Sequence, residues 1–216
     1  MGFENKLTIL VDMDDVLEHF VDNWIFAINE KFDRNVDPKT LNSWEILHLY
    51  PGISELEMEQ ILESPDFWKK VKPIDGAVET MKKLIDDGHD VYVATSSWYK
   101  TLVPKMDEVL FKYFDFLKWD KVIVAKDKWM IRGDVVIDDG IHNLKNRDDN
   151  SLKLLFTATH NKSYDAEANG FIRVNNWKDV YREIVKEESI RRDFIPCEYN
   201  NSGVCDLYDK FCNNCR

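Results

Sequence analysis

Short apolar segments alternate with amphipathic segments along most of this chain. The apolar segments are three to five residues long and rich in Val, Ile and Leu, which predicts buried strands. Between several of them, apolar residues recur at helical spacing. Strands separated by helices pair in parallel and are covered on both faces, so we expect an α/β fold with a doubly wound (Rossmann-like) parallel sheet in three αβα layers. The predicted strands comprise residues 7–11, 91–94, 122–125, 135–137, 152–156 and 171–174.

A long stretch after the first strand carries no strand signal and predicts a small helical cap. An apolar stripe from Val21 to Phe32 indicates one helix, and Ser54 with Glu57 forms a capping-box pattern for another. We expect Pro65 to end that second helix and Asp75 to cap the next. The predicted organisation is a core formed by residues 1–18 and 75–190, a cap at 19–74 and a tail at 191–216.

Polar residues follow the predicted strands at the point where each strand ends. Because ligands collect at the carboxyl ends of parallel strands, we expect these residues to form one site. Each of them alone also fits a simpler role: a solvated turn, a helix cap or a surface lysine. Their order on successive strands favours a shared site. They are Asp12, Asp14 and Asp15 after the first strand, Thr95 and Ser96 after the second, Lys128 after the third, and Asp138 and Asp139 after the fourth.

This set of residue types is typical of phosphoryl transfer. Asp12 and Asp14 are two residues apart, so that one could act as a nucleophile and the other as an acid or base. Clustered carboxylates repel each other, and a hard cation such as Mg²⁺ relieves that repulsion. Thr95 and Lys128 offer a hydroxyl and a positive charge to phosphate oxygens.

Four motifs resemble those of the haloacid-dehalogenase-like superfamily of phosphatases: D-M-D-D-V-L at 12–17, V-Y-V-A-T at 91–95, Lys128, and V-V-I-D-D at 135–139. Longer segments are similar to the 5′(3′)-deoxyribonucleotidases within it. These segments are D-M-D-D-V-L-E-H-F, S-P-D-F-W-K-K-V-K-P-I-D-G-A, A-T-S-S-W and A-K-D-K-W-M-I-R-G-D-V-V-I-D-D. Two positions depart from that family's pattern: this chain has Asp15 where the family usually has Gly, and Ser97 where it usually has Pro.

The resemblance implies roles for individual residues in a Mg²⁺-dependent phosphatase that hydrolyses small phosphomonoesters, (deoxy)nucleoside monophosphates in the closest family. Asp12 would attack phosphorus to give a phosphoaspartate, and Asp14 would serve as acid and then base. Mg²⁺ would be held by Asp12, the backbone carbonyl of Asp14 and Asp138, with Asp139 in support. The phosphate-binding residues would be Thr95, Ser96 and Lys128, and the residues that contact the base would be Phe20, Phe67 and Trp68.

Three other functions fit parts of the pattern. One is a sugar-phosphate phosphatase of the same superfamily, and another is a non-enzymatic binding module recruited through the tail. A phosphorylatable receiver module also clusters Asp, Thr and Lys, but its lysine comes last in the chain, whereas Lys128 precedes Asp138. Turnover of a generic phosphomonoester would separate an enzyme from a binding module.

Charge and hydropathy restrict the partners. The formal net charge of −11 disfavours binding to a nucleic-acid polymer. The sequence has no run of about twenty apolar residues, so it predicts no membrane span. Residues 1–6 do not resemble a signal peptide, and we therefore expect a cytoplasmic protein. The oligomeric state is not predicted.

All four cysteines lie in the tail: Cys197, Cys205, Cys212 and Cys215. Four thiolates around one structural Zn²⁺ would fold a segment that is too short to have a hydrophobic core. Free thiols and a disulfide are the alternatives, the latter disfavoured in a reducing cytoplasm.

Overall fold

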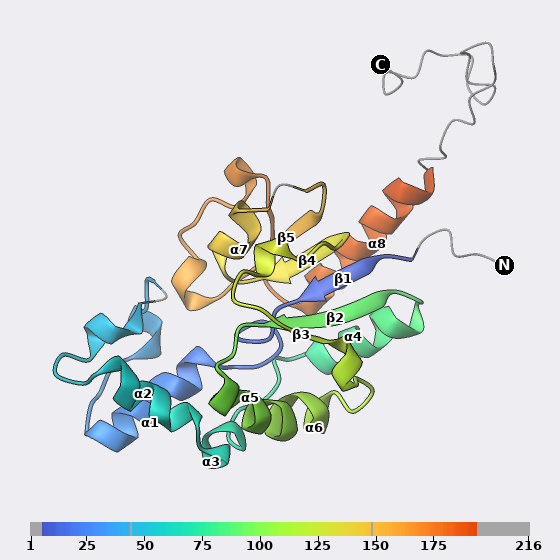
Figure 1. Cartoon of the computed structure of the whole chain (residues 1–216). Helices are drawn as coiled ribbons and strands as arrows, with labels where there is room; N and C mark the ends of the chain where they lie inside the picture. Colours follow the sequence, from blue (N-terminus) through green and yellow to red (C-terminus); the bar gives the residue numbers. More distant parts are fainter. Residues whose placement is uncertain (1–5, 44, 148, 194–216) are drawn as a thin grey trace, which may run out of the picture.

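A six-stranded, all-parallel sheet forms the centre of the molecule in the computed structural model, which describes residues 6–193 except 44 and 148. The strand order is β3-β2-β1-β4-β5-β6, with helices on both faces (Figure 1). The predicted three-layer α/β fold is therefore confirmed. The strands are β1 (Thr8–Val11), β2 (Asp90–Thr95), β3 (Val122–Val124), β4 (Val135–Asp138), β5 (Leu152–Phe156) and β6 (Ile172–Val174).

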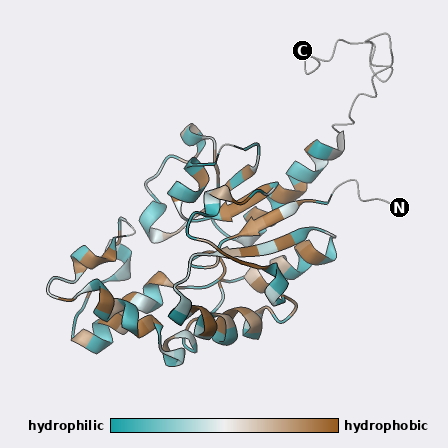
Figure 2. Cartoon of the chain, viewed as in Figure 1, coloured by the Kyte–Doolittle hydropathy of each residue, from teal (hydrophilic) through white to brown (hydrophobic). Residues whose placement is uncertain are grey.

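The central strand β1 is buried on both faces because its side chains alternate between two apolar cores. Ile9 and Val11 belong to the larger core, and Leu10 belongs to the smaller one. This two-sided burial explains why β1 is apolar at nearly every position. Figure 2 shows mostly apolar residues along the strands and a mixture of polar and apolar residues along the surrounding helices.

Helices of the core domain are divided between the two faces. The larger core contains residues of α4 (Ala77–Asp86), α8 (Trp177–Asp193) and the π-helical turn Met106–Leu110 that joins α5 (Tyr99–Lys105) to α6 (Phe111–Tyr113). The smaller core contains Leu144 of α7 (Ile141–Lys145).

The cap consists of three helices inserted between β1 and α4: α1 (Val21–Phe32), α2 (Glu55–Leu62) and α3 (Pro65–Trp68), with short 3₁₀ turns at Pro38–Thr40 and Ile46–Leu49. Figure 1 shows these helices on the side toward which the strand arrows point. The two connections to the core run side by side. Ile74 N donates to Leu17 O at 2.9 Å, and His19 N donates to Lys72 O at 3.0 Å.

The capping box of α2 is confirmed, since Ser54 and Glu57 satisfy each other's backbone N–H groups. Two other predictions about helix ends were wrong. Helix α2 has already ended at Leu62, and Pro65 begins α3, where the missing N–H costs nothing. The N-cap of α4 is Gly76, with φ of 80°, so Asp75 does not cap it.

No helix in residues 6–193 is both long and apolar enough to cross a membrane. The four cysteines lie outside the described residues, so the zinc site stays a prediction. The division of the chain into core, cap and tail at residues 18, 74 and 190 also stays a prediction.

Candidate active site

Asp12 is the first residue after β1, and its carboxylate is held from two sides. Oδ1 accepts a hydrogen bond from the backbone N–H of Met13 at 2.6 Å and lies 2.5 Å from the Nζ of Lys128. Asp12 is only 5% exposed. The position of this oxygen is therefore fixed, whereas Oδ2 accepts no hydrogen bond from residues 6–193.

The neighbouring strand β4 ends in Asp138, whose carboxylate is also fixed by donors. Oδ1 accepts from Gly140 N at 2.7 Å and from Asn143 Nδ2 at 3.0 Å, and Lys128 Nζ lies 3.4 Å from Oδ2. A side chain at position 140 would meet Asp138 Oδ1 at 2.9 Å, so Gly140 allows this approach. Lys128 thus bridges the carboxylate of Asp12, at the end of β1, and the carboxylate of Asp138, at the end of β4.

Asp139 completes a group of buried carboxylates that could hold a metal ion. One carboxylate oxygen each from Asp12, Asp138 and Asp139 lies within 4.8 Å of the others. Asp139 is fully buried, and neither oxygen has hydrogen-bond geometry with a described residue, although His160 Nε2 lies 3.3 Å from Oδ2. Buried carboxylate oxygens without donors fit a hard divalent cation.

The electrostatics of this group agree with a cation site. Burial, reinforced by Asp138 and Asp14, raises the pKa of Asp12 to about 7 despite the opposing effect of Lys128. Burial, reinforced by the charges of Asp12, Asp138 and Asp15, raises the pKa of Asp139 well above its ordinary value. Burial alone would lower the pKa of Lys128, but Asp12 and Asp138 raise it above its ordinary value. The carboxylates here outnumber the cations, and a divalent ion would balance them.

Asp14 pairs with a lysine that the sequence analysis missed. Lys105 Nζ, on α5, lies 2.6 Å from Asp14 Oδ2 and 2.9 Å from Thr95 Oγ1, and the lysine is 1% exposed. The hydroxyl of Thr95, predicted to bind phosphate, is therefore turned to Lys105. A spacing signal existed, because Thr101, Lys105 and Val109 lie four residues apart on one buried helical stripe.

Glu18 is a second buried group that the sequence analysis missed. Its side chain is fully buried beside Asp14, and both its oxygens and Asp14 Oδ1 lack an N–H or O–H donor among the described residues. Burial and the charge of Asp14 raise the pKa of Glu18 well above its ordinary value. Two facing carboxyl groups are more stable when they share a proton, and the raised pKa of Glu18 favours that arrangement.

Asp15 stands where the resembled family usually has glycine, and the structure explains how aspartate fits there. Its backbone is left-handed, with φ of 54°, a conformation that favours glycine and that aspartate tolerates better than most residues. Oδ1 accepts hydrogen bonds from Phe20 N at 3.0 Å and Val21 N at 3.2 Å. Asp15 thus satisfies two N–H groups at the start of α1, which glycine could not do.

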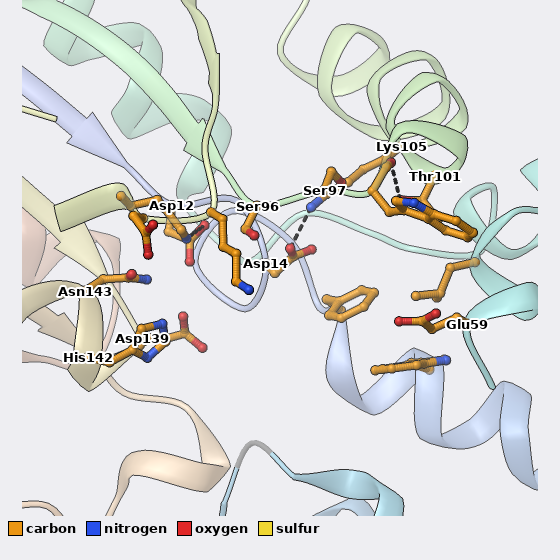
Figure 3. Close-up of a pocket in the computed structure, with 18 of the residues that line it drawn as sticks. Asp12, Asp14, Glu59, Ser96, Ser97, Thr101, Lys105, Asp139, His142 and Asn143 are labelled. Carbon is orange, nitrogen blue, oxygen red and sulfur yellow. Dashed lines mark hydrogen bonds and ion pairs between the residues drawn. The ribbon is translucent and has the colours of Figure 1, made fainter. Parts of the chain in front are cut away.

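A cavity of about 440 Å³ lies between the core and the cap and brings most of the predicted site residues together. Figure 3 shows Asp12, Ser96, Asp139 and Asn143 around one end of it. Thr95 is fully buried and does not line the cavity, and Phe67 lines a separate cavity between α1 and α2. The predicted residues that line it are Asp12, Asp14, Phe20, Trp68, Ser96, Lys128 and Asp139.

The aromatic residues of the cap pack mainly against one another. Phe20 stacks on Trp24 and Trp68 with ring centroids 5.5 and 5.7 Å apart, and Phe67 meets it edge-on. Phe20 is 8% exposed and Trp68 is 1% exposed. The aromatic residues with more accessible surface in the cavity wall are Trp24 and Trp98, the latter 43% exposed.

Comparison with known proteins places this site in a family. Residues 5–190 match the family model described as "5' nucleotidase, deoxy (Pyrimidine), cytosolic type C protein". The 5'(3')-deoxyribonucleotidase of Bacillus subtilis (strain 168) is 31% identical over 182 residues, covering 83% of this chain and 99% of the relative.

Solved structures with low sequence identity share the fold. A HAD-family hydrolase from Deinococcus radiodurans R1, solved with bound phosphate and sodium, has a TM-score of 0.56 at 14% identity and covers 85% of this chain and 97% of its own. A family IA HAD hydrolase from Entamoeba histolytica has a TM-score of 0.52 at 14% identity, with 84% and 99% covered. The sequence match extends across the core, the cap and every strand end of the site, and the chain belongs to the cytosolic type C family of deoxy 5' nucleotidases, which are phosphoric monoester hydrolases.

Proposed function

We propose that this chain is a Mg²⁺-dependent phosphatase that hydrolyses (deoxy)nucleoside monophosphates through a phosphoaspartate on Asp12. One observation carries the proposal. Asp12, Lys128, Asp138 and Asp139 come from three separate segments of the sequence and meet beside a cavity that also contains Asp14. A nucleophile, an acid–base group, a cation and a metal-binding carboxylate cluster are together sufficient for phosphoryl transfer.

The proposed Mg²⁺ ligands are Asp12, Asp138 and Asp139, with the backbone carbonyl of Asp14 carried over from the family resemblance. The buried oxygens of Asp139, which accept no hydrogen bond from a described residue, support this assignment. When bound, Mg²⁺ would offset the negative charge of the phosphate and of the carboxylates around it. Lys128, whose Nζ contacts both Asp12 and Asp138, would contribute a further positive charge.

In the first proposed step, an oxygen of Asp12 forms a bond to phosphorus while the bond from phosphorus to the substrate oxygen breaks. The contacts of Oδ1 with Met13 N and Lys128 orient the carboxylate for this attack. Asp14 gives a proton to the leaving oxygen. In the second step Asp14 takes a proton from water, the water attacks phosphorus, and Asp12 leaves as a free carboxylate.

Lys105 and Ser96 have supporting roles in this proposal. Lys105 holds the carboxylate of Asp14 at 2.6 Å and ties it to β2 through Thr95. Ser96 lines the cavity next to Asp12 and offers a hydroxyl to a phosphate oxygen. The amide of Asn143 fixes Asp138.

A nucleoside fits the cavity because its cap side is apolar and aromatic. Phe20, Trp24, Leu62 and Trp68 form that wall, and Trp98 of the core also lines the cavity. Aromatic surfaces favour flat bases through stacking. The name of the Bacillus subtilis relative, a 5'(3')-deoxyribonucleotidase, supports the same substrate class.

A substrate screen tests the proposed function. Deoxynucleoside 5′- and 3′-monophosphates, their ribonucleotide counterparts, hexose phosphates and p-nitrophenyl phosphate are compared with Mg²⁺ present. We expect the highest kcat/KM for a deoxynucleoside monophosphate. A higher kcat/KM for a hexose phosphate would contradict the nucleotide assignment, and no turnover of any phosphomonoester would contradict the phosphatase.

Replacing Lys105 with methionine is expected to lower kcat by about a hundredfold with little change in KM, because Asp14 loses the contact that orients it. The substitution preserves most of the side-chain volume. Removing a buried partner also destabilises the fold, so Tm is measured beside the kinetics.

The control for this variant is Lys100→Met, since Lys100 is an exposed lysine of the same helix that pairs with Glu63. A Lys105→Met protein with lower Tm and wild-type kcat would show that Lys105 only stabilises the fold.

Mg²⁺ is expected to raise Tm more at pH 8 than at pH 6. Asp12, with a pKa raised to about 7, must lose its proton to bind metal, and each pH unit below that value costs about 1.4 kcal/mol of binding per proton displaced. In the metal-free protein, the raised pKa of Asp12 contributes to the stability of the fold. This contribution is fully present below pH 3.8, the pKa of Asp12 in the unfolded chain, and is lost as the pH rises through about 7. Thermal melts with and without Mg²⁺ at both pH values measure the difference, and an equal Mg²⁺ shift at the two values would contradict the ligand assignment.

A further inference from the structure

Helix α7 lies between two parts of the active site. Near its N-terminal end, Asn143 Nδ2 donates to Asp138 Oδ1 at 3.0 Å. Just past its C-terminal end, Arg147 reaches the 3₁₀ turn Lys128–Met130, whose lysine contacts the same carboxylate. A helix of five residues therefore connects the support of Asp138 to the support of Lys128.

The guanidinium of Arg147 holds two carbonyl groups of the segment that carries Lys128. Nη1 donates to Lys128 O at 3.2 Å, and Nη2 donates to Ile131 O. Within the turn, Ile131 N donates to Lys128 O at 3.1 Å, and Arg147 adds its two hydrogen bonds from outside. Trp129 and Met130 are exposed, so their side chains do little to anchor the turn. The position of the Lys128 backbone therefore depends on Arg147.

Arg147 itself does not face a substrate. Its side chain is 1% exposed, and the described residues that line the active-site cavity do not include it. Nη2 lies 2.7 Å from Asp149 Oδ2, and Nε donates to Ser151 Oγ at 3.4 Å. Asp149 balances the charge of Arg147 locally, and the planar guanidinium holds all these acceptors at once. What Arg147 contributes to the site is therefore position.

The sheet fixes the backbone of Arg147 in turn. Lys153 Nζ, on β5, donates to Arg147 O at 2.9 Å. Strand β5 pairs with β4, and Asp138 at the end of β4 lies opposite Leu155 in the register. The arginine is thus held against the strand pair that carries Asp138, and it transmits that fixed position to the turn of Lys128.

We propose that Arg147 is a positioning residue for Lys128, and that it sets where the ammonium group lies between Asp12 and Asp138. Lys128 Nζ is 2.5 Å from Asp12 Oδ1 and 3.4 Å from Asp138 Oδ2. A lysine side chain is a flexible four-carbon stem, so its ammonium keeps such distances only when the backbone is fixed. The proposed function gives Lys128 the task of orienting Asp12 and of adding positive charge beside the phosphate, and the inference about Arg147 rests on that function.

A double-mutant cycle between Arg147 and Lys128 tests the proposal. Arg147→Met is expected to lower kcat for a deoxynucleoside monophosphate by about ten- to a hundredfold, as the loss of an outer partner in a site does. Lys128→Met is expected to lower kcat at least as much. In the Lys128→Met protein, adding Arg147→Met is expected to change kcat by less than about twofold, because the group through which Arg147 acts is gone. Tm is measured for each protein, and the kinetics are measured at a temperature where all of them are folded.

Arg147→Lys separates positioning from stability. The ammonium keeps a positive charge beside Asp149, so this variant is expected to fold and to have a Tm closer to wild type than that of Arg147→Met. A single ammonium does not reproduce the planar fork that holds two carbonyl groups and a carboxylate, so kcat is still expected to fall by about tenfold. If Arg147→Met does not fold, the cycle is run with Arg147→Lys.

The control variant is Asp149→Asn, an isosteric change that removes the charge partner of Arg147 and leaves the carbonyl groups of Lys128 and Ile131 in place. It is expected to lower Tm and to keep kcat within severalfold of wild type. Wild-type kcat in Arg147→Met and Arg147→Lys would overturn the role of Arg147 and leave the phosphatase intact. The same conclusion would follow from an equal loss of kcat with and without Lys128. Wild-type kcat in Lys128→Met, or a wild-type protein that turns over no phosphomonoester, would overturn the proposed function and this inference with it.

Discussion

Replacing Asp12 with asparagine is expected to lower kcat by about a thousandfold or more, because only binding and electrostatic effects remain when a covalent nucleophile is lost. The amide keeps the shape of the carboxylate and can still accept the hydrogen bond from Met13 N. The raised pKa of Asp12 shows that its charge is unfavourable in the metal-free site, so Asp12→Asn is expected to fold with an unchanged or higher Tm. Steady-state kinetics on a deoxynucleoside monophosphate and a thermal melt measure both effects.

Asp127→Asn is the matched control for this variant. Asp127 is an exposed carboxylate that lines the same cavity and has no assigned role in the chemistry. It is expected to keep kcat within severalfold of wild type, about the range of ordinary surface changes. A kcat near wild type in Asp12→Asn would contradict the assignment of the nucleophile.

Removal of Mg²⁺ is expected to lower activity by about a thousandfold or more. Without a cation, the carboxylates of Asp12, Asp138 and Asp139 lie close together and repel a phosphate. Lys128 supplies one positive charge to this group, which does not balance three carboxylates and a phosphate. Ca²⁺ is expected to restore little activity, because its larger and looser coordination shell misplaces the phosphoryl group.

The experiment compares protein in EDTA with the same sample after Mg²⁺ is added in excess over EDTA. EDTA binds Zn²⁺ far more tightly than Mg²⁺, so recovery under these conditions is due to Mg²⁺ and not to zinc in the tail. Full activity in EDTA before Mg²⁺ is added would exclude the proposed metal site.

The arrangement of the proposed catalytic residues was predictable because it follows a local pattern. Asp12, Lys128 and Asp138 each follow a short apolar strand, and the carboxyl ends of parallel strands meet at one edge of a sheet. Sequence order alone therefore implied that residues more than a hundred positions apart in the chain lie together, and the structure confirms the fold on which that implication depends.

The role of Lys105 could not be predicted in the same way. Its partner Asp14 is 91 residues away in the sequence, and the contact depends on how α5 packs against the end of β2. A lysine on a helix is usually exposed. Lys105 lies between Thr101 and Val109 on one buried stripe, but this pattern can be recognised only once the helix boundaries are known.

Helix boundaries were the least predictable part of the cap. A proline is compatible with the first turn of a helix as well as with its end, and Pro65 occupies the former position. The aromatic residues of the cap were assigned to the substrate from sequence. In the structure Phe20 and Trp68 line the cavity but stack on each other, and Phe67 lines a different cavity.

The phosphoenzyme is the most direct test of the central proposal. The protein is mixed with a ³²P-labelled deoxynucleoside monophosphate and Mg²⁺, quenched in acid within a single turnover, and digested. We expect labelled protein that appears and decays during the turnover, with the label on the peptide containing Asp12 and absent from the Asp12→Asn variant. Complete turnover of the nucleotide with no label on that peptide at any quench time would contradict a phosphoaspartate on Asp12.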